Sequence, residues 1–327
     1  MRKLLGSALL IVLFGLTACN EPSEPYEANE FTTNPTAETT VVEETTQPIA
    51  ITEPATKPPR EPVRTLTYDE VDFDFRMYST HALLFNLDTG EVLFSHEADT
   101  RAYPGSMTKI LTVLIDIDTM DLDKRIPMYF DGPELIRQGA LESGFFYGEV
   151  RSIREILTAI MVPSGAEATW AFANYMSDTY EGFAAMMNEK AQEIGMHDSN
   201  FVSSIGLHDP NHYSTPNDFA KLIKYALEIP FFREMFLMRD MPLETPNSRG
   251  DVLPSTLFGR VSDTTFEGGE LFGGKTGFTA EGGRCLTSIA TNGEHEFIMI
   301  TFGASDAENT IGHILDHLRI YEYFFNR

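Results

Sequence analysis

The sequence predicts an α/β (α+β) fold, with antiparallel strands at both ends of the folded domain and helices in its middle. Near the start of that domain, apolar residues 82–87 and 92–94 are separated by the turn sequence Asp-Thr-Gly. Near its end, an Asn-Gly pair separates apolar residues 285–290 from 297–302, which is a strong β-hairpin signal. Between these two regions, apolar side chains recur at helical spacing.

The first residues have the layout of an export signal. Arg2 and Lys3 precede an apolar run, residues 4–16, that is too short to span a bilayer stably. The run ends in Leu-Thr-Ala-Cys, which resembles the lipobox of bacterial lipoproteins. We therefore expect residues 1–18 to be a lipoprotein signal peptide. Lipidation of Cys19 would anchor the exported protein to the outer face of the bacterial cell membrane; the alternative is a plain secretory cleavage site.

Residues 19–66 are rich in Glu, Thr and Pro and show almost no helical or strand periodicity. Such a segment cannot bury enough apolar surface to fold, so we expect a disordered tether. Residues 67–327 are enough for a sizeable core and form the predicted catalytic domain. The formal net charge of -25 argues against nucleic acid as a partner. If Cys19 carries lipid, Cys285 is left alone, and no disulfide is expected.

A candidate nucleophile follows the first hairpin. Pro104 and Gly105 end a loop, and the apolar residues that follow have helical spacing, so Ser106 is expected at a helix N-terminus. Lys109 then lies one turn further along, over Ser106. A serine hydroxyl is a weak nucleophile until a base removes its proton, and a neutral lysine is such a base. Alone the S-x-x-K pattern is weak, since an ordinary helix start also contains it.

A second serine lies between two predicted helices. Ser152 and Glu155 form a capping-box pattern before an apolar helical run that stops at Pro163. Ser164 occupies the break before the next helix, where its hydroxyl is free to face a cleft. Further helices are expected at residues 179–194, from 215 onward and at the C-terminal end, whereas residues 230–268 are expected to be irregular.

A third pattern, Lys275-Thr276-Gly277, precedes Phe278 on a predicted strand. The glycines around Lys275 allow another backbone to lie close along that strand. Two histidine pairs, His208 with His212 and His313 with His317, raise the possibility of a metal site. Neither pair has a further ligand at suitable spacing, so packing histidines are favoured, and we expect no metal or cofactor.

The three patterns, in this order, resemble the motif set of the penicillin-recognising serine enzymes. In addition, residues 82–112, 195–218 and 273–290 are similar to the low-molecular-weight D-alanyl-D-alanine carboxypeptidases. The resemblance covers nearly all of residues 67–327. It implies a β-lactamase/transpeptidase-like fold, in which an antiparallel sheet is flanked by helices, a helical lobe adjoins it and a cleft lies between.

The resemblance also implies a reaction and its residues. The substrate would be a peptidoglycan stem peptide ending in D-Ala-D-Ala, and β-lactam antibiotics would be acylating inhibitors. Ser106 would attack the penultimate D-Ala, Lys109 would take its proton and Ser164 would pass a proton to the leaving D-Ala. The remaining expectations concern binding: the substrate carboxylate is held by Lys275 and Thr276, with Gly277 beside them, and the oxyanion by the N–H groups of Ser106 and Phe278.

Two departures from that pattern keep alternatives open. Ala166 stands where the family usually has an Asn that orients substrate and lysine, and Ser305 stands where several relatives place a basic residue. Ala166 motivates a non-catalytic or weakly active peptidoglycan-binding lipoprotein as the alternative. A β-lactamase is less favoured, because no Asn in the chain follows a Leu, as the deacylating E-x-x-L-N segment of class A enzymes requires.

Overall fold

The computed structural model describes residues 64–132, 134, 139–305 and 309–327. The predicted signal peptide, Cys19 and nearly all of the predicted tether lie outside these ranges. Within them, no helix is long and apolar enough to cross a membrane.

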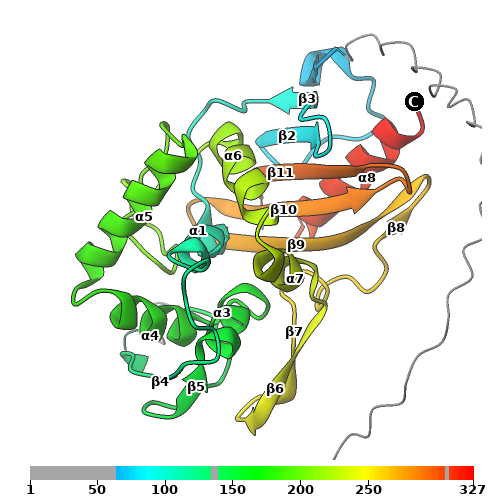
Figure 1. Ribbon diagram of the computed structural model, residues 1–327. Helices are drawn as coiled ribbons and strands as arrows, with labels where there is room; N and C mark the ends of the chain where they lie inside the picture. Colours follow the sequence, from blue (N-terminus) through cyan, green and yellow to red (C-terminus); the bar gives the residue numbers. More distant parts are fainter. Residues whose placement is uncertain (1–63, 133, 135–138, 306–308) are drawn as a thin grey trace, which may run out of the picture. The chain divides into compact units, whose positions relative to one another are not determined.

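A seven-stranded sheet forms the centre of this part of the chain (Figure 1). Its strand order is β1-β3-β2-β11-β10-β9-β8, and every neighbouring pair is antiparallel except β1 with β3, which is parallel. The predicted antiparallel sheet is therefore confirmed, with that one exception. The strands are β1 (Leu66–Thr67), β2 (His81–Asn86), β3 (Val92–His96), β8 (Thr265–Phe266), β9 (Gly269–Thr279), β10 (Gly283–Thr291) and β11 (Glu296–Ala304).

Both predicted hairpins are present. Gly90 (φ 74°) lies in the turn between β2 and β3, and Gly293 (φ 87°) lies in the turn between β10 and β11. Glycine adopts positive φ values without steric cost, which explains why these turn sequences were readable. The two hairpins pair through β2 and β11, so strands from opposite ends of the domain become neighbours.

Helices enclose the sheet on both faces. A C-terminal helix, α8 (Gly312–Phe325), covers one face, and the other face meets a lobe built from the remaining helices. Side chains alternate accordingly along β2: Leu83 and Phe85 enter the core shared with the lobe, whereas Ala82 and Leu84 enter the core under α8. The helices of the lobe are α1 (Lys109–Leu114), α3 (Ile153–Met161), α4 (Ala166–Met176), α5 (Tyr180–Ile194), α6 (Pro216–Leu227) and α7 (Pro230–Leu237). Two short 3-10 helices are η1 (Tyr68–Glu70) and η2 (Gly105–Thr108).

The helix boundaries follow from capping residues. The side chains of Ser152, Thr179 and Thr215 each accept a hydrogen bond from a backbone N–H in the first turn of α3, α5 and α6, respectively. Gly195, with φ 90°, ends α5 in the left-handed conformation typical of a helix C-terminus. These starts and stops were all readable in the sequence.

The expectation of irregular structure at residues 230–268 was wrong. Pro230 opens α7, and a two-stranded ribbon follows, made of β6 (Asp240–Asn247) and β7 (Gly250–Pro254). The ribbon lies outside the main sheet and exposes most of its side chains, so it lacks the apolar alternation that announces a strand. A second small ribbon, which pairs β4 (Arg125–Pro127) with β5 (Val150–Ser152), was also missed, because strands of three residues are too short to show an alternating pattern.

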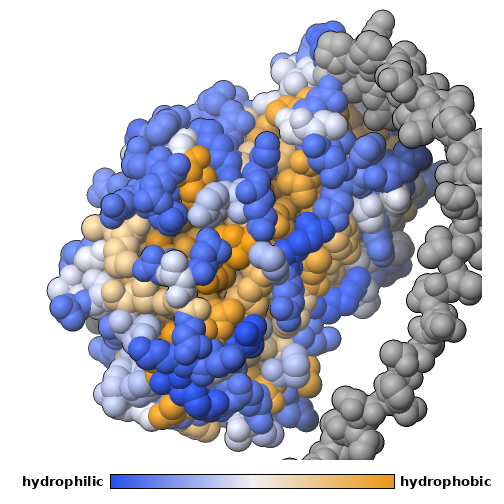
Figure 2. All heavy atoms as spheres, viewed as in Figure 1, coloured by the Kyte–Doolittle hydropathy of each residue, from blue (hydrophilic) through white to orange (hydrophobic). Residues whose placement is uncertain are grey.

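Two of the four histidines raised as metal candidates, His317 and His212, lie within hydrogen-bond distance of hydroxyl side chains. His317 is buried, with Nδ1 2.6 Å from Ser288 Oγ and Nε2 2.9 Å from Thr301 Oγ1. His212 is buried beside Thr108. Among the residues that the structure describes, no group of three or more His, Cys, Asp or Glu side chains could hold a metal ion. Figure 2 shows hydrophilic residues over much of one face, with hydrophobic residues gathered across its middle.

Candidate active site

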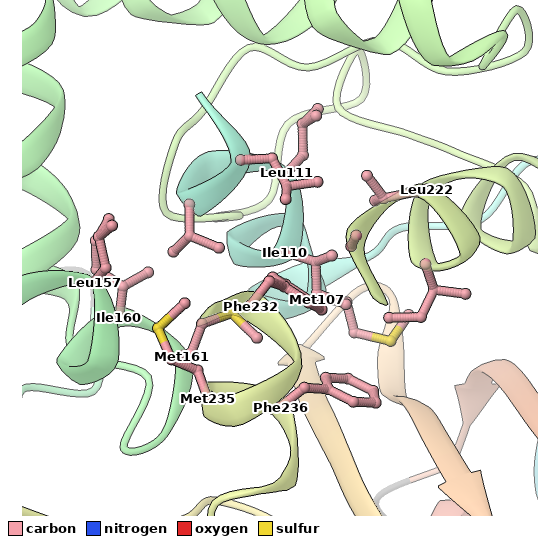
Figure 3. Packing of buried hydrophobic residues seen from close by; sticks show 14 of the residues in the cluster. Met107, Ile110, Leu111, Leu157, Ile160, Met161, Leu222, Phe232, Met235 and Phe236 are labelled. Atoms are coloured by element: carbon pink, nitrogen blue, oxygen red, sulfur yellow. The ribbon is translucent and has the colours of Figure 1, made fainter. Parts of the chain in front are cut away.

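Ser106 lies in η2, directly before α1, so the helical segment begins with a tighter turn than the sequence suggested. The Met107 N–H donates to the Pro104 carbonyl oxygen at 3.0 Å and closes this turn. Below it, Met107, Ile110 and Leu111 are buried among side chains of α3, α6 and α7, as Figure 3 shows. The apolar side of the segment therefore anchors it, while Ser106 stays partly exposed at the surface of the lobe.

Lys109 is 1% exposed, and its Nζ lies 3.1 Å from Ser106 Oγ. Burial holds the pKa of Lys109 well below its usual range, and the charge of Lys275 lowers it further, against an opposing effect of Glu167. Nζ also donates a hydrogen bond to the Ile205 carbonyl oxygen at 2.7 Å. A lysine held neutral in this way has a lone pair available for the serine proton.

The loop that supplies the Ile205 carbonyl is fixed from two sides. Ser203 Oγ accepts hydrogen bonds from the N–H groups of Ile205 and Gly206. Gly206 has φ 86°, and a side chain there would collide with the Gly105 carbonyl oxygen, so the loop touches the nucleophile turn directly. The carbonyl that orients Lys109 is therefore part of a rigid support.

His212 connects the end of this loop to η2. Its Nδ1 accepts a hydrogen bond from the Val202 N–H at 3.2 Å, which leaves Nε2–H to donate to Thr108 Oγ1 at 2.7 Å. Burial lowers the pKa of His212 to about 4, so the ring is neutral near pH 7. The prediction of a packing histidine is confirmed at this position.

Ser164 lies in the break between α3 and α4, as the sequence indicated. It adopts φ 67°, which is uncommon for a residue with a side chain and is often found at functional sites. Its Oγ is buried and has no hydrogen-bond partner within the described residues. A buried hydroxyl without a partner is costly, so a bound molecule that bonds to it would gain energy.

The third motif runs along β9. Lys275 is fully buried, and burial lowers its pKa to about 7. Its Nζ donates to the Thr276 carbonyl oxygen at 3.1 Å, and Thr276 Oγ1 donates to Thr256 Oγ1 at 2.8 Å. This places a cation and a hydroxyl side by side at one end of the strand, an arrangement that suits a carboxylate.

The expected close approach of another backbone to β9 is confirmed. A side chain at Gly277 would collide with the Pro104 carbonyl oxygen, and a Cβ atom on Gly105 would lie 2.7 Å from the Phe278 nitrogen. The backbone of Phe278 therefore lies beside that of the residue preceding Ser106. The backbone segments that carry the N–H groups of Ser106 and Phe278 are therefore adjacent, which an oxyanion site made of these two groups would need.

These segments share one cleft of about 590 Å³. Six of the predicted site residues line it: Ser106, Lys109, Ser164, Thr276, Gly277 and Phe278. Lys275, which is fully buried in β9, is not among the lining residues. A nucleophile, a base, an unpaired hydroxyl and a carboxylate-binding strand therefore meet in one place. This set of groups suits nucleophilic acyl transfer, which needs no metal.

Sequence reasoning missed three charged residues of the cleft: Arg260, Glu281 and Arg284. Arg284 pairs in register with Phe278, and its guanidinium carbon lies 4.7 Å from the centroid of that ring. The sequence around an arginine on a strand does not indicate whether its side chain lines a cleft. Position 305, where relatives place a basic residue, follows Ala304, the β11 partner of Arg284.

Ala166 and Glu167 take structural places beside the cleft. Ala166 is buried and packs with Ile205, whose carbonyl orients Lys109. The carboxylate of Glu167 accepts hydrogen bonds from the Ser143 hydroxyl and from the N–H groups of Gly144 and Phe145. Glu167 is buried and is not among the residues that line the cleft, although its charge acts on Lys109.

Comparison with known proteins agrees with this geometry. The family model described as D-alanyl-D-alanine carboxypeptidase matches residues 69–306. The chain is 32% identical over 227 residues to the D-alanyl-D-alanine carboxypeptidase DacF of Bacillus subtilis, covering 68% of this chain and 57% of that protein. It is 27% identical over 219 residues to the D-alanyl-D-alanine carboxypeptidase of Streptomyces sp. strain K15, covering 64% of this chain and 75% of that protein.

The crystal structure of the Streptomyces K15 DD-transpeptidase has a TM-score of 0.69 to this chain, with 24% identity, and covers 78% of this chain and all of that one. This likeness confirms the predicted transpeptidase-like fold. The match to DacF spans little more than half of that relative's length. Both the family model and these relatives confirm the resemblance read from the three motifs: the chain belongs to the D-alanyl-D-alanine carboxypeptidase family.

Proposed function

We propose that this protein is a serine-type carboxypeptidase that removes the terminal D-Ala from peptidoglycan stem peptides ending in D-Ala-D-Ala. The observation that carries the proposal is the distance of 3.1 Å between Lys109 Nζ and Ser106 Oγ in a buried setting that keeps the amine neutral. Membership of the carboxypeptidase family supports the choice of substrate.

Acylation begins when the neutral amine of Lys109 takes the hydroxyl proton of Ser106. The Ser106 oxygen then attacks the carbonyl carbon of the penultimate D-Ala, and the resulting oxyanion accepts hydrogen bonds from the N–H groups of Ser106 and Phe278. Ser164 relays the proton from Lys109 to the nitrogen of the terminal D-Ala, which leaves both groups neutral again. The C–N bond breaks, and the terminal D-Ala leaves as the free amino acid. Water then hydrolyses the ester on Ser106 and restores the enzyme.

Lys275 and Thr276 hold the terminal carboxylate of the substrate during this sequence. The lysine has a pKa of about 7 in the free protein, and an incoming carboxylate favours its charged form. A β-lactam ring presents a similar carbonyl and carboxylate, so the same groups would open it and leave a stable acyl-enzyme. Because this acyl-enzyme is stable, β-lactams would inhibit the protein.

We also propose that the protein is exported and held at the outer face of the bacterial cell membrane through lipid on Cys19. The support is the order of charged residues, short apolar run and small residues before that cysteine. Several acyl chains on one residue give stable anchoring, since each buried CH₂ adds roughly 0.8 kcal/mol. The Glu, Thr and Pro-rich residues after Cys19 would then serve as the tether.

Incubating the protein with benzylpenicillin should add the mass of one penicillin molecule, and peptide mapping should locate it on Ser106. Ser106→Ala should lose the adduct and lower D-Ala release from a D-Ala-D-Ala peptide by at least about a thousandfold. Ser95→Ala, on β3 away from the cleft, is the matched control and should behave as the wild type does. Rapid turnover of penicillin would instead identify a β-lactamase, and the lack of both adduct and D-Ala release would identify a binding protein.

The rate of acylation by penicillin should rise with pH to a plateau as Lys109 loses its proton, because only the neutral amine acts as a base. With the pKa of Lys109 held low, this plateau should begin well below pH 10.5, the ordinary lysine value. Lys275 lowers the Lys109 pKa only while it is charged, below its own pKa of about 7. Lys275→Met removes that charge, so the part of the profile that rises in this pH range should move to higher pH. Lys124→Met, at an exposed lysine, is the control; equal profiles for both variants would contradict the assignment.

Cys19→Ala should release the protein from the membrane fraction of a bacterium that expresses the full chain. Labelling with a radioactive fatty acid should mark the wild type and not the variant, while Cys285→Ala should remain labelled, because Cys285 is a buried thiol inside β10. Retention of the Cys19→Ala variant in washed membranes without label would show that another feature holds the protein there.

A further inference from the structure

We propose that a hollow beside Trp170 binds the glycan of the cell-wall polymer, as a site for neutral N-acetylated sugars separate from the catalytic cleft. The hollow measures about 600 Å³, within the range of about 300–1,000 Å³ typical of small-molecule sites. This inference rests on the proposed function, since it takes as its ligand the polymer that carries the stem peptide.

Aromatic rings form the walls of the hollow. Its lining includes Tyr129, Phe130, Tyr147 and Trp170, and the Tyr147 ring lies 5.4 Å from that of Tyr129 and 6.0 Å from that of Phe130, between centroids. Tyr129 is 51% exposed and Tyr147 is 69% exposed, so their faces are open to a ligand. The C–H faces of pyranose rings pack against aromatic faces of this kind, while tyrosine hydroxyls add polar contacts at the edge.

Polar groups and charge favour a neutral ligand with hydroxyl groups. Asp131 and Asn174 complete the polar part of the lining, and none of the described residues that form it is basic. Asn174 donates a hydrogen bond to the Tyr129 carbonyl oxygen at 3.2 Å, which leaves its side-chain oxygen as an acceptor. With a formal net charge of -25, the chain would repel an anionic ligand. Sugar hydroxyls, by contrast, would donate to the Asp131 carboxylate.

The hollow connects to the catalytic cleft through shared residues. Trp170 also lines a second hollow of about 450 Å³, together with Ile205, Leu207 and His208. Those three residues in turn line the cleft that contains Ser106. A polymer whose peptide enters the cleft therefore has a continuous path along the surface to the aromatic rings.

Buried apolar residues support the aromatic side chains of this hollow. Phe130 and Trp170 pack against a small core that contains Ala166 and Ile205. The same Ile205 fixes Lys109 through its carbonyl oxygen, so the aromatic hollow and the catalytic base share a support. A sugar held at Trp170 would thus lie in a fixed relation to the nucleophile, which lowers the entropy lost when the peptide binds.

Fluorescence titration tests the proposal directly, because Trp170 is the one tryptophan in the sequence. Adding the β-1,4-linked tetrasaccharide of N-acetylglucosamine to the full chain should give a saturable change in emission, with a matching isotherm by calorimetry. Tyr147→Ala should weaken binding about tenfold through loss of stacking. Tyr147→Phe keeps the ring and should bind nearly as the wild type does.

Phe146→Ala is the matched control, since Phe146 is 58% exposed, adjacent in sequence and absent from the lining of the hollow. It should leave sugar binding unchanged. The proposal is overturned if the tetrasaccharide gives no saturable signal, if Phe146→Ala weakens binding as much as Tyr147→Ala, or if a free stem pentapeptide displaces the sugar. Binding without D-Ala release would refute only the proposed function, and D-Ala release without binding would refute only this inference.

Discussion

The contact between the buried amine of Lys109 and the hydroxyl of Ser106 is the interaction on which the rest of the site depends. A lysine side chain that is 1% exposed would be very costly in its charged form, and the structure avoids that cost by lowering its pKa. The amine donates one hydrogen bond to the Ile205 carbonyl oxygen, and its lone pair stays available for the serine proton. The packing that buries Lys109 in α1 therefore also makes it a base for Ser106.

Three glycines make this contact possible. Gly105, Gly206 and Gly277 belong to three separate segments, and a side chain at any of them would strike a neighbouring backbone atom. Their absence of a Cβ allows the nucleophile turn, the loop before α6 and the edge of β9 to touch. Lys275 is buried in the same strand as Gly277, and its charge lowers the Lys109 pKa. The three glycines therefore determine how closely the charged and polar groups of the site approach one another.

Much of this arrangement could be predicted because its signals are local. The hairpin turns, the caps at Ser152 and Thr215 and the three motifs each lie within a few residues of sequence. Contacts of backbone groups, such as the Ile205 carbonyl, have no residue signature and could not be predicted. The ribbon of β6 and β7 was missed because its side chains are exposed, and the hollow at Trp170 because its walls come from segments far apart in the chain.

The protonation state of Lys109 in the resting protein tests the central claim most directly. Carbon-13 NMR of protein labelled at lysine Cε, with the Lys109 signal assigned by its loss in Lys109→Met, would report the charge of this one amine as pH is varied. We expect the transition between the charged and the neutral amine to fall well below pH 10.5, the ordinary lysine value. A Lys109 signal that stays in the charged form up to pH 10 would contradict the role of this lysine as the base.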